Sequence, residues 1–311
     1  MTQGEIRYPD YMKFKQQRQD INTAMMALLA GSQLAANTLN LTAGSDRTLR
    51  EIFPRVNHIE RFNLRSDVAQ RNLQEAEAHL ARIGIPYILA LQEAYLKSVL
   101  DLLRQDGKKI VHPNGSVNRV VRMVNMHEVF MATCGIGALP GPAGMLELFH
   151  ALRLIRNGVI HDNGTYSKTL HGVLNGLSAD ALKYWQEAAG HSATQVLGNN
   201  SQLALNSGEL VLAFGVNKSL ALSVNAILGA TLSKQKWAEI AVEHFAKKST
   251  APKNSSSWAR SLKGFARHNY GPVQITSGQL QTAAVAGGFW TIPGLNDKMC
   301  VWKRQFPGLD L

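Results

Sequence analysis

Residues 147–164, which read ELFHALRLIRNGVIHDNG, are the stretch of sequence that decides the fold. In and around them, apolar residues recur at steps of three and four, the spacing of one buried helix face: Met145, Leu148, Phe149, Leu152, Ile155 and Val159. Gly164 follows Asp162 and Asn163, and glycine readily adopts the positive φ of a helix C-terminal cap. The pattern predicts an amphipathic helix that ends near His161.

Three polar residues near the end of this expected helix form the candidate site. Asn157 and His161 are four residues apart and share a helix face. Arg156 points about 100° away on a side chain that is long enough to reach the same place. An arginine, an amide and a histidine together suit the handling of a phosphodiester, because guanidinium binds phosphate and imidazole transfers protons. An Arg and a His at this spacing also occur often by chance, and a surface Arg beside a helix-capping His is the ordinary alternative.

The composition is that of a globular protein with a strong positive charge. At 311 residues, with 45% hydrophobic and 18% charged residues, the chain is long enough for two domains and is not broadly disordered. Its net charge of +11 favours a polyanionic partner, nucleic acid first. A soluble protein that is simply basic explains the charge equally well.

Cysteine usage and apolar patterning indicate a cytoplasmic protein. Cys134 and Cys300 are too few for a disulfide framework or a metal cluster, which fits a reducing compartment. The uncharged stretches at residues 21–45 and 129–146 are interrupted by polar side chains or by prolines and glycines, so neither predicts a membrane-spanning helix. We therefore expect no membrane association.

No motif in the chain predicts a cofactor or a metal ion. The glycines between residues 135 and 144 precede a helix, but no Lys-Ser/Thr follows them, and Pro140 takes the place of a glycine in the dinucleotide-binding pattern. The ten histidines include no HExxH and no paired spacing for zinc. The glycine-rich stretch is expected to be a loop, and neither a cofactor nor a metal is expected.

The remaining periodicities predict a mainly α-helical bundle with a small β-hairpin insertion. Further helices are expected over residues 20–37, 66–82, 86–104, 117–132, 178–189 and 217–247. Gly84 should close the helix before it, Pro86 should start the next one, and Ser178 should cap its own helix. Residues 202–205 and 209–214 alternate around an Asn-Ser-Gly turn, a pattern typical of a β-hairpin.

A change of composition near residue 249 divides the chain. Residues 249–257 read STAPKNSSS and are expected to link a helical domain at residues 1–248 to a small, basic, aromatic-rich domain at residues 258–311. Residues 251–311 hold seven Lys or Arg against two Asp, which makes several cations candidates for contacts with nucleic acid: Arg260, Lys263, Arg267, Lys303 and Arg304. The aromatic residues of this segment suit the core of the small domain, with Lys and Arg on its solvated rim.

The polar group at the helix end resembles the signature of a known family. Arg156-Asn157-x3-His161, with Glu147 upstream, is similar to the R-N-x3-H motif of the HEPN superfamily of helical bundles, many of which are metal-independent ribonucleases. Residues 74–103 are similar to that family's earlier helix pair. The resemblance covers roughly residues 60–247.

This resemblance implies an endoribonuclease in which the 2′-OH of RNA attacks the adjacent phosphorus and leaves a 2′,3′-cyclic phosphate. It also implies a homodimer with a composite active site, in which His161 of both copies transfers protons, usually worth about 10²–10⁴-fold in rate. Arg156 would hold the phosphate, Asn157 would orient it or the histidine, and Glu147 would fix Arg156. Ribonucleases of this kind resemble defence effectors and toxins, which implies an antitoxin or a regulatory trigger protein as a further partner beside RNA.

Three other functions stay open. A non-catalytic HEPN-like module would bind a nucleotide, RNA or a partner protein through the same Arg and His. A DNA-binding regulator would use the basic C-terminal segment, with residues 277–286 as a recognition helix. The lack of basic residues on that helix and the following Gly287 and Gly288 argue against it. A structural helical bundle would have no site at all.

Overall fold

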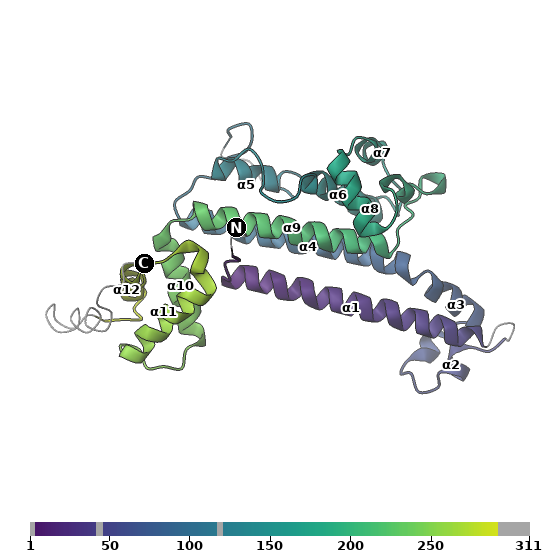
Figure 1. Cartoon of the computed structure of the whole chain (residues 1–311). Helices are drawn as coiled ribbons and strands as arrows, with labels where there is room; N and C mark the ends of the chain where they lie inside the picture. Colours follow the sequence, from purple (N-terminus) through teal and green to yellow (C-terminus); the bar gives the residue numbers. More distant parts are fainter. Residues whose placement is uncertain (1–3, 42–45, 117–120, 292–311) are drawn as a thin grey trace. The chain divides into compact units, whose positions relative to one another are not determined.

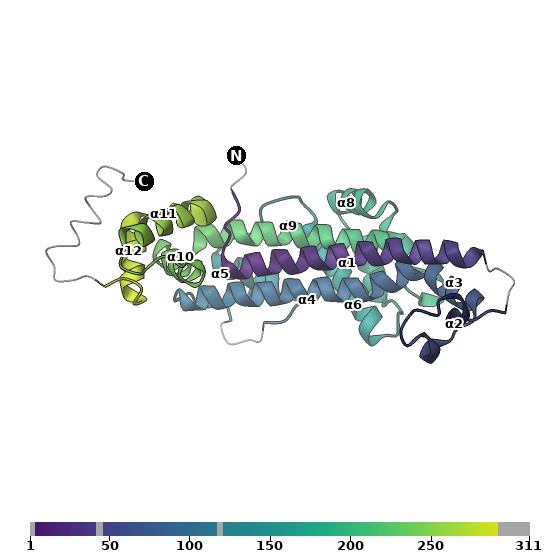
Figure 2. The same cartoon turned by 90° about the horizontal axis from the view of Figure 1, so that it is seen from below.

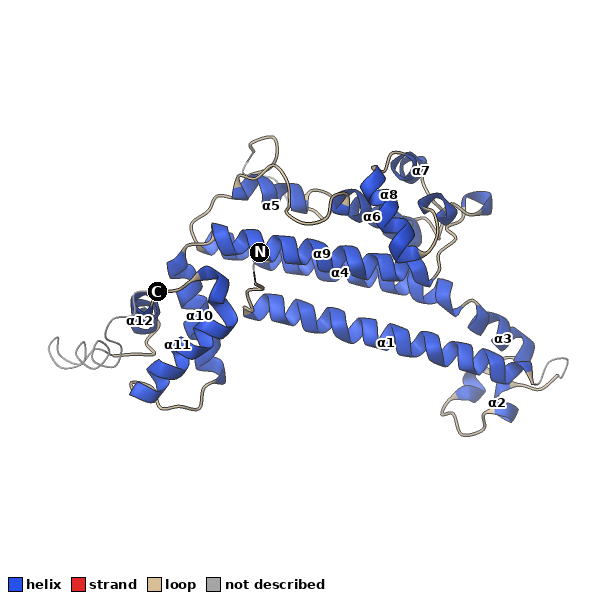
Figure 3. Ribbon diagram, in the orientation of Figure 1, coloured by secondary structure: helices blue, strands red, loops and turns tan. Residues whose placement is uncertain are grey.

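The computed structural model describes residues 4–41, 46–116 and 121–291. Over these ranges the protein is mainly α-helical, with twelve α-helices, four short 3-10 helices and no strand (Figure 3). The α-helices are α1 (Pro9–Asn40), α2 (Leu49–Ile52), α3 (Ser66–Gln74), α4 (Ala76–Gln105), α5 (Met126–Cys134), α6 (Met145–His161), α7 (Lys168–Asn175), α8 (Ala179–Ala189), α9 (Ser207–Thr231), α10 (Lys234–Lys248), α11 (Ser256–Tyr270) and α12 (Ser277–Ala286). The predicted helical class is confirmed.

The chain folds into two compact units, each built from separate parts of the sequence. The first unit comprises Met1–Lys15, Glu93–Gly141 and Leu220–Leu311, and the second comprises Gln16–Gln92 and Pro142–Ser219. Three of the four divisions fall inside α1, α4 and α9, and the fourth, between Gly141 and Pro142, falls between α5 and α6. The predicted linker at residues 249–257 lies within the first unit, and whether residues 258–311 fold on their own stays a prediction.

In the second unit, α6 packs against α7 and α8 (Figure 1). The predicted apolar face of α6 is buried at Met145, Leu148, Phe149, Leu152 and Ile155, while Val159 is half-buried. The Ser178 hydroxyl accepts a hydrogen bond from the Ala181 amide at 3.3 Å and so caps α8 as expected. The apolar face of α6 therefore packs in the core, and the polar residues Arg156, Asn157 and His161 at its C-terminal end do not take part in that packing.

In the first unit, α10 packs against α11 and α12, and the three lie together in both views (Figures 1 and 2). Large aromatic side chains fill this part of the core, and Trp237, Trp258 and Tyr270 are each 1% exposed or less. Trp258 and Tyr270 of α11 therefore belong to the core, as the sequence suggested, while Phe265 is half-buried. Trp302 and Phe306 lie outside the described residues.

The predicted β-hairpin is wrong. Residues 209–214 lie in α9, and residues 202–205 make only isolated bridges, between Leu203 and Leu197 and between Gln202 and Thr165. A capping arrangement starts the helix at the expected turn, because the Asn206 side chain accepts from the Gly208 amide at 2.6 Å and the Glu209 carboxylate accepts from the Asn206 amide at 2.8 Å. In the apolar run that follows, Leu210, Leu212, Ala213 and Phe214 are all buried, a pattern that does not alternate as a strand would.

Two predicted helix boundaries are also wrong. Gly84 and Pro86 lie inside α4, where the burial of Ile85, Ile88 and Leu89 outweighs the helix-breaking tendency of both residues. A Cβ on Gly84 would lie 2.4 Å from Leu210 Cδ1, so this glycine lets α4 and α9 approach closely. The helix expected over residues 217–247 is in fact two helices.

Ser233 marks the break between α9 and α10. Its hydroxyl accepts a hydrogen bond from the Lys236 amide at 3.1 Å, which starts α10 at Lys234.

The helix expected at residues 117–132 is shorter, since α5 begins at Met126, and residues 117–120 lie outside the described ranges.

α9 also has a composition that the sequence reading overlooked. Within the described ranges, it is a helix long and apolar enough to cross a membrane by length and composition alone, and 61% of its apolar window is buried in the structure. A core helix of a water-soluble protein has the same properties. α9 therefore gives only weak evidence for a membrane span.

We expect Asn225→Ala to destabilise the first unit. The Asn225 amide accepts from the Ile6 backbone N–H at 3.0 Å and donates to the Ile6 carbonyl at 2.8 Å, and Asn225 is only 2% exposed. Its removal leaves two backbone groups unpaired in the core, which should lower the free energy of unfolding by about 2–4 kcal/mol. Urea denaturation measures the loss; the exposed Asn22→Ala serves as the control, and equal effects would contradict the prediction.

We expect His244 to make the first unit sensitive to acid. His244 Nδ1 lies 2.9 Å from the Tyr270 hydroxyl, and burial, together with Lys248 and Lys247, lowers the pKa of His244 from its ordinary 6.5 to about 4. As the pH falls, the unfolded chain protonates His244 near pH 6.5, whereas the folded protein does so only near pH 4. The contribution of His244 to the free energy of unfolding is therefore complete above pH 6.5, and it falls by about 1–3 kcal/mol as the pH drops toward 4. Urea denaturation across this range should show a shallower pH dependence for His244→Gln, and identical profiles would contradict the assignment.

Candidate functional site

The C-terminal end of α6 brings together three of the four predicted catalytic residues. Arg156 Nη1 donates to Asn157 Oδ1 at 3.1 Å and lies 3.3 Å from His161 Nε2. Arg156 and Asn157 are half-buried, whereas His161 is exposed at the last position of the helix. The guanidinium therefore contacts the amide and the imidazole with one nitrogen.

The contact between Arg156 and His161 defines which side chain donates and which accepts the hydrogen bond. A guanidinium in a protein only donates hydrogen bonds, so His161 Nε2 must accept with its lone pair. The Nε2 atom of His161 is therefore directed at the Arg156 guanidinium.

Arg156 also has unused hydrogen-bonding capacity. Its Nε is buried and has no hydrogen-bond partner among the described residues. A buried donor without an acceptor costs about 1–3 kcal/mol, so a shift of the side chain toward an anionic ligand would recover part of that cost. Guanidinium matches a phosphate or carboxylate through two parallel hydrogen bonds.

Glu147 lies apart from this group, which corrects the role expected for it within one chain. Its Oε2 accepts a hydrogen bond from the Ser178 backbone amide at 2.7 Å, at the start of α8. Arg156 follows Glu147 by nine helical positions, a rise of about 14 Å. The carboxylate therefore joins α6 to α8 instead of fixing Arg156.

A close backbone contact at Gly158 positions the polar end of α6. The Gly158 carbonyl accepts from the Asp162 amide at 3.2 Å and the Gly164 amide at 2.9 Å, and Gly164 has a φ of +82° as the sequence predicted. A Cβ on Gly158 would lie 2.4 Å from the Thr165 carbonyl oxygen. The glycine inside the Arg-His motif thus allows the following segment to fold back over the helix, a role that the spacing of the motif alone did not reveal.

The folded-back segment is tied to residues from a distant part of the chain. The Tyr166 amide donates to the Ser201 carbonyl at 2.8 Å, and the Leu203 amide donates to the Gly164 carbonyl at 2.8 Å. Arg82 Nη2 lies 3.5 Å from the Leu203 carbonyl, which brings a further guanidinium to the segment that packs on Gly158. Arg82 was not predicted as a site residue, because only the contact through Leu203 connects it with α6.

The predicted nucleic-acid-binding residues that the structure describes, Arg260, Lys263 and Arg267, belong to the first unit. Arg260, Lys263 and Arg267 follow one another at three- and four-residue steps along α11, and Arg260 and Arg267 are exposed. They form one cationic stripe on that helix. Lys303 and Arg304 lie outside the described residues.

The described ranges contain no group of three or more His, Cys, Asp or Glu that could hold a metal ion. Arg156, Asn157 and His161 instead offer donors and a proton acceptor, which suit an anion that gains or loses a proton. Comparisons with protein families, with curated proteins and with solved structures found no match. The resemblance to the HEPN superfamily therefore depends on the residues of this chain alone.

We expect Gly158→Ala to destabilise the second unit. The new Cβ would press against the Thr165 carbonyl oxygen, and backbone atoms must move to relieve the overlap. The free energy of unfolding should fall by about 1–3 kcal/mol. Urea denaturation provides the measurement.

Gly172→Ala is the matched control for this substitution. Gly172 lies in α7, where an added Cβ meets no atom within 4 Å, so alanine should leave stability unchanged or raise it by up to about 1 kcal/mol. If both variants unfold at the same urea concentration, the contact at Gly158 does not carry the energy assigned to it.

Proposed function

We propose that this protein is a metal-independent endoribonuclease that cleaves RNA by attack of the 2′-OH on the adjacent phosphorus. The observation that carries the proposal is the contact of Arg156 Nη1 with both Asn157 Oδ1 and His161 Nε2 at the exposed end of α6. The site would combine a guanidinium that binds phosphate with an imidazole that transfers protons. The net charge of +11 supports a polyanionic substrate.

In the proposed reaction, a scissile phosphate draws the Arg156 guanidinium toward its equatorial oxygens. This movement frees His161 Nε2 to remove the proton from the 2′-OH, whose oxygen then forms a bond to phosphorus. The bond from phosphorus to the 5′-oxygen breaks, and the 5′-oxygen takes up a proton. The products are a 2′,3′-cyclic phosphate and a 5′-hydroxyl, and Arg156 stabilises the charge that grows on the phosphoryl oxygens between them.

The geometry of in-line attack calls for a second proton-transferring group. The attacking and leaving oxygens lie on opposite sides of phosphorus, so one imidazole does not serve both in a single step. We propose that His161 of a second copy supplies the acid, in a two-fold dimer that joins two α6 ends into a composite site. Asn157 would hold the histidine or the phosphate in place.

The biological setting is part of the same proposal. An RNA-cleaving enzyme in the cytoplasm damages its own cell unless it is restrained. We therefore propose a role as a defence effector or toxin, held by an antitoxin or released by a trigger protein. The two exposed cations of the α11 stripe, Arg260 and Arg267, would contribute RNA contacts, whereas the buried Nζ of Lys263 would add only its charge.

A non-catalytic binding module is the second candidate. In the structure, Arg156 occupies the lone pair of His161 Nε2, and Glu147 is engaged with Ser178. The same residues would then hold a phosphate without cleaving it. Cleavage assays distinguish the two functions.

The decisive experiment incubates the full chain with labelled RNA in EDTA. We expect cleavage that persists without divalent metal and leaves 2′,3′-cyclic phosphate ends, detected by mass spectrometry. His161→Ala should lower the rate by roughly 10²–10⁴-fold and Arg156→Ala by roughly 10²–10³-fold. Light scattering on the same samples should give the mass of a dimer.

His171→Ala is the matched control. His171 and Asn175 form a second His–Asn pair, exposed on α7, with the Asn175 Nδ2 atom 3.2 Å from His171 Nδ1, and among the described residues no arginine is hydrogen-bonded to it. This variant should cleave like the parent. Cleavage that EDTA abolishes, or that survives in His161→Ala, would refute the proposal; RNA binding without cleavage by the parent would favour the binding module.

A further inference from the structure

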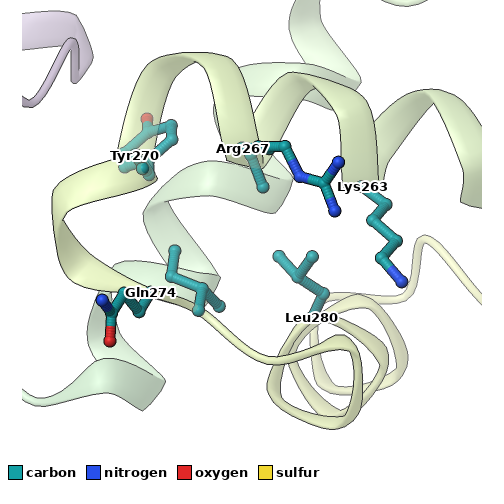
Figure 4. Close-up of a pocket in the computed structure, with 8 residues that line it drawn as sticks. Lys263, Arg267, Tyr270, Gln274 and Leu280 are labelled. Carbon is teal, nitrogen blue, oxygen red and sulfur yellow. The ribbon is translucent and has the colours of Figure 1, made fainter. Parts of the chain in front are cut away.

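The first unit contains a cavity of about 210 Å³ between α11 and α12 (Figure 4). Its floor is aliphatic and comes from three buried residues, Ala266, Ile275 and Leu280. Lys263, Arg267 and Gln274 supply polar groups around it. Figure 4 shows Arg267 and Lys263 extending from α11 toward α12, with Leu280 pointing toward them.

The size of this cavity selects a small ligand. An apolar protein cavity of about 150 Å³ binds benzene, and a water molecule accounts for about 30 Å³ of liquid. A cavity of about 210 Å³ therefore accommodates one ring or a short branched chain with a small polar group attached. A whole nucleotide exceeds that volume.

The described lining of the cavity favours an anion, since it includes Lys263 and Arg267 and no Asp or Glu. Burial raises the pKa of Tyr270, and Asp10, the nearest acidic influence on the cavity, raises it further. No Asp or Glu occurs between Glu243 and Asp297, whereas this stretch holds six Lys or Arg: Lys247, Lys248, Lys253, Arg260, Lys263 and Arg267. Lys263 Nζ is buried and is engaged within the chain, so it contributes charge close to the cavity wall. The exposed guanidinium of Arg267 is the group placed to reach a ligand, and its fork matches a carboxylate through two hydrogen bonds.

The floor of the cavity argues against a nucleobase. The Tyr270 ring is 1% exposed and its hydroxyl is paired with His244, so it offers no stacking surface to a base. Gln274 is the one amide side chain among the lining residues. Aliphatic walls with a cation at the rim fit an apolar group that carries one negative charge.

We propose that the cavity between α11 and α12 binds a compact amphiphilic carboxylate, with the apolar part on Ala266, Ile275 and Leu280 and the carboxylate on Arg267. Burial of the apolar part drives binding. The apolar wall excludes water on one side of the ion pair and so strengthens it relative to a pair in open solvent. This site is separate in sequence and in chemistry from the end of α6.

Titration calorimetry of the full chain with phenylacetate tests the proposal. We expect a Kd on the order of 0.1–1 mM, a range suited to so few ligand atoms. Acetate, which lacks the ring, and 2-phenylethanol, which lacks the charge, should bind at least about tenfold more weakly. No RNA and no cleavage enter this experiment, so its result is independent of the proposed ribonuclease.

Three variants locate the site. Arg267→Ala should weaken phenylacetate about tenfold, while Arg260→Ala, which removes the same charge from α11 outside the cavity, should change the Kd by less than about twofold. Ala266→Leu fills the floor without a change of charge and should abolish binding. Because Arg267 is exposed, Arg267→Ala should keep the fold, which circular dichroism verifies for all three.

Four results would overturn the proposal. They are no binding of phenylacetate at 10 mM (about ten times the weakest expected Kd), equal weakening by Arg267→Ala and Arg260→Ala, equal affinity for 2-phenylethanol, and tighter Arg267-dependent binding of 5′-AMP. The second result indicates general surface charge, the third a purely apolar cavity, and the fourth a nucleotide site.

Discussion

The end of α6 depends on a backbone carbonyl that packs where a helix side chain would normally be. The Thr165 carbonyl oxygen would lie 2.4 Å from a Cβ at position 158, so only glycine admits it. The segment that follows α6 is thereby held against the helix and pairs with Ser201 and Leu203. Arg156 and His161 consequently sit at a helix end with a defined boundary, and sites on regular elements hold their geometry better than sites on free loops.

The two cationic regions of the protein differ in what surrounds the charge. At the end of α6, Arg156 is bonded to an amide and an imidazole, so its environment is polar and includes a proton acceptor. On α11, Arg267 borders an aliphatic cavity. A guanidinium beside a base suits a reacting phosphodiester, whereas a guanidinium beside an apolar wall suits an acid that stays intact. Arginine therefore takes part in two proposals of different chemistry, as Arg156 at the end of α6 and as Arg267 on α11.

Several errors of the sequence reading share one cause. The Asn206-Ser-Gly turn and the Gly84 and Pro86 break were judged from neighbouring residues, and the Glu147–Arg156 pairing from a resemblance to a short motif. In the structure, Glu209 completes a cap that starts α9, the burial of Ile85 and Ile88 carries α4 through its weak point, and Ser178 takes the Glu147 carboxylate. Each outcome was decided by a partner or by burial that the local pattern did not include.

The sequence by itself determined the apolar face of α6, its end near His161 with the positive φ of Gly164 after it, and the Ser178 cap of α8, because all three depend on residues within about one or two helical turns of one another. It also placed Arg156, Asn157 and His161 on neighbouring helix positions, which is a matter of helical spacing. Only the tertiary structure decided that Gly158 lies under Thr165, that Glu147 binds the start of α8, and that α11 and α12 enclose a cavity beside Arg267. These features join segments that are distant in the chain, and their energy comes from close packing and from pairing buried polar groups, which no local pattern contains.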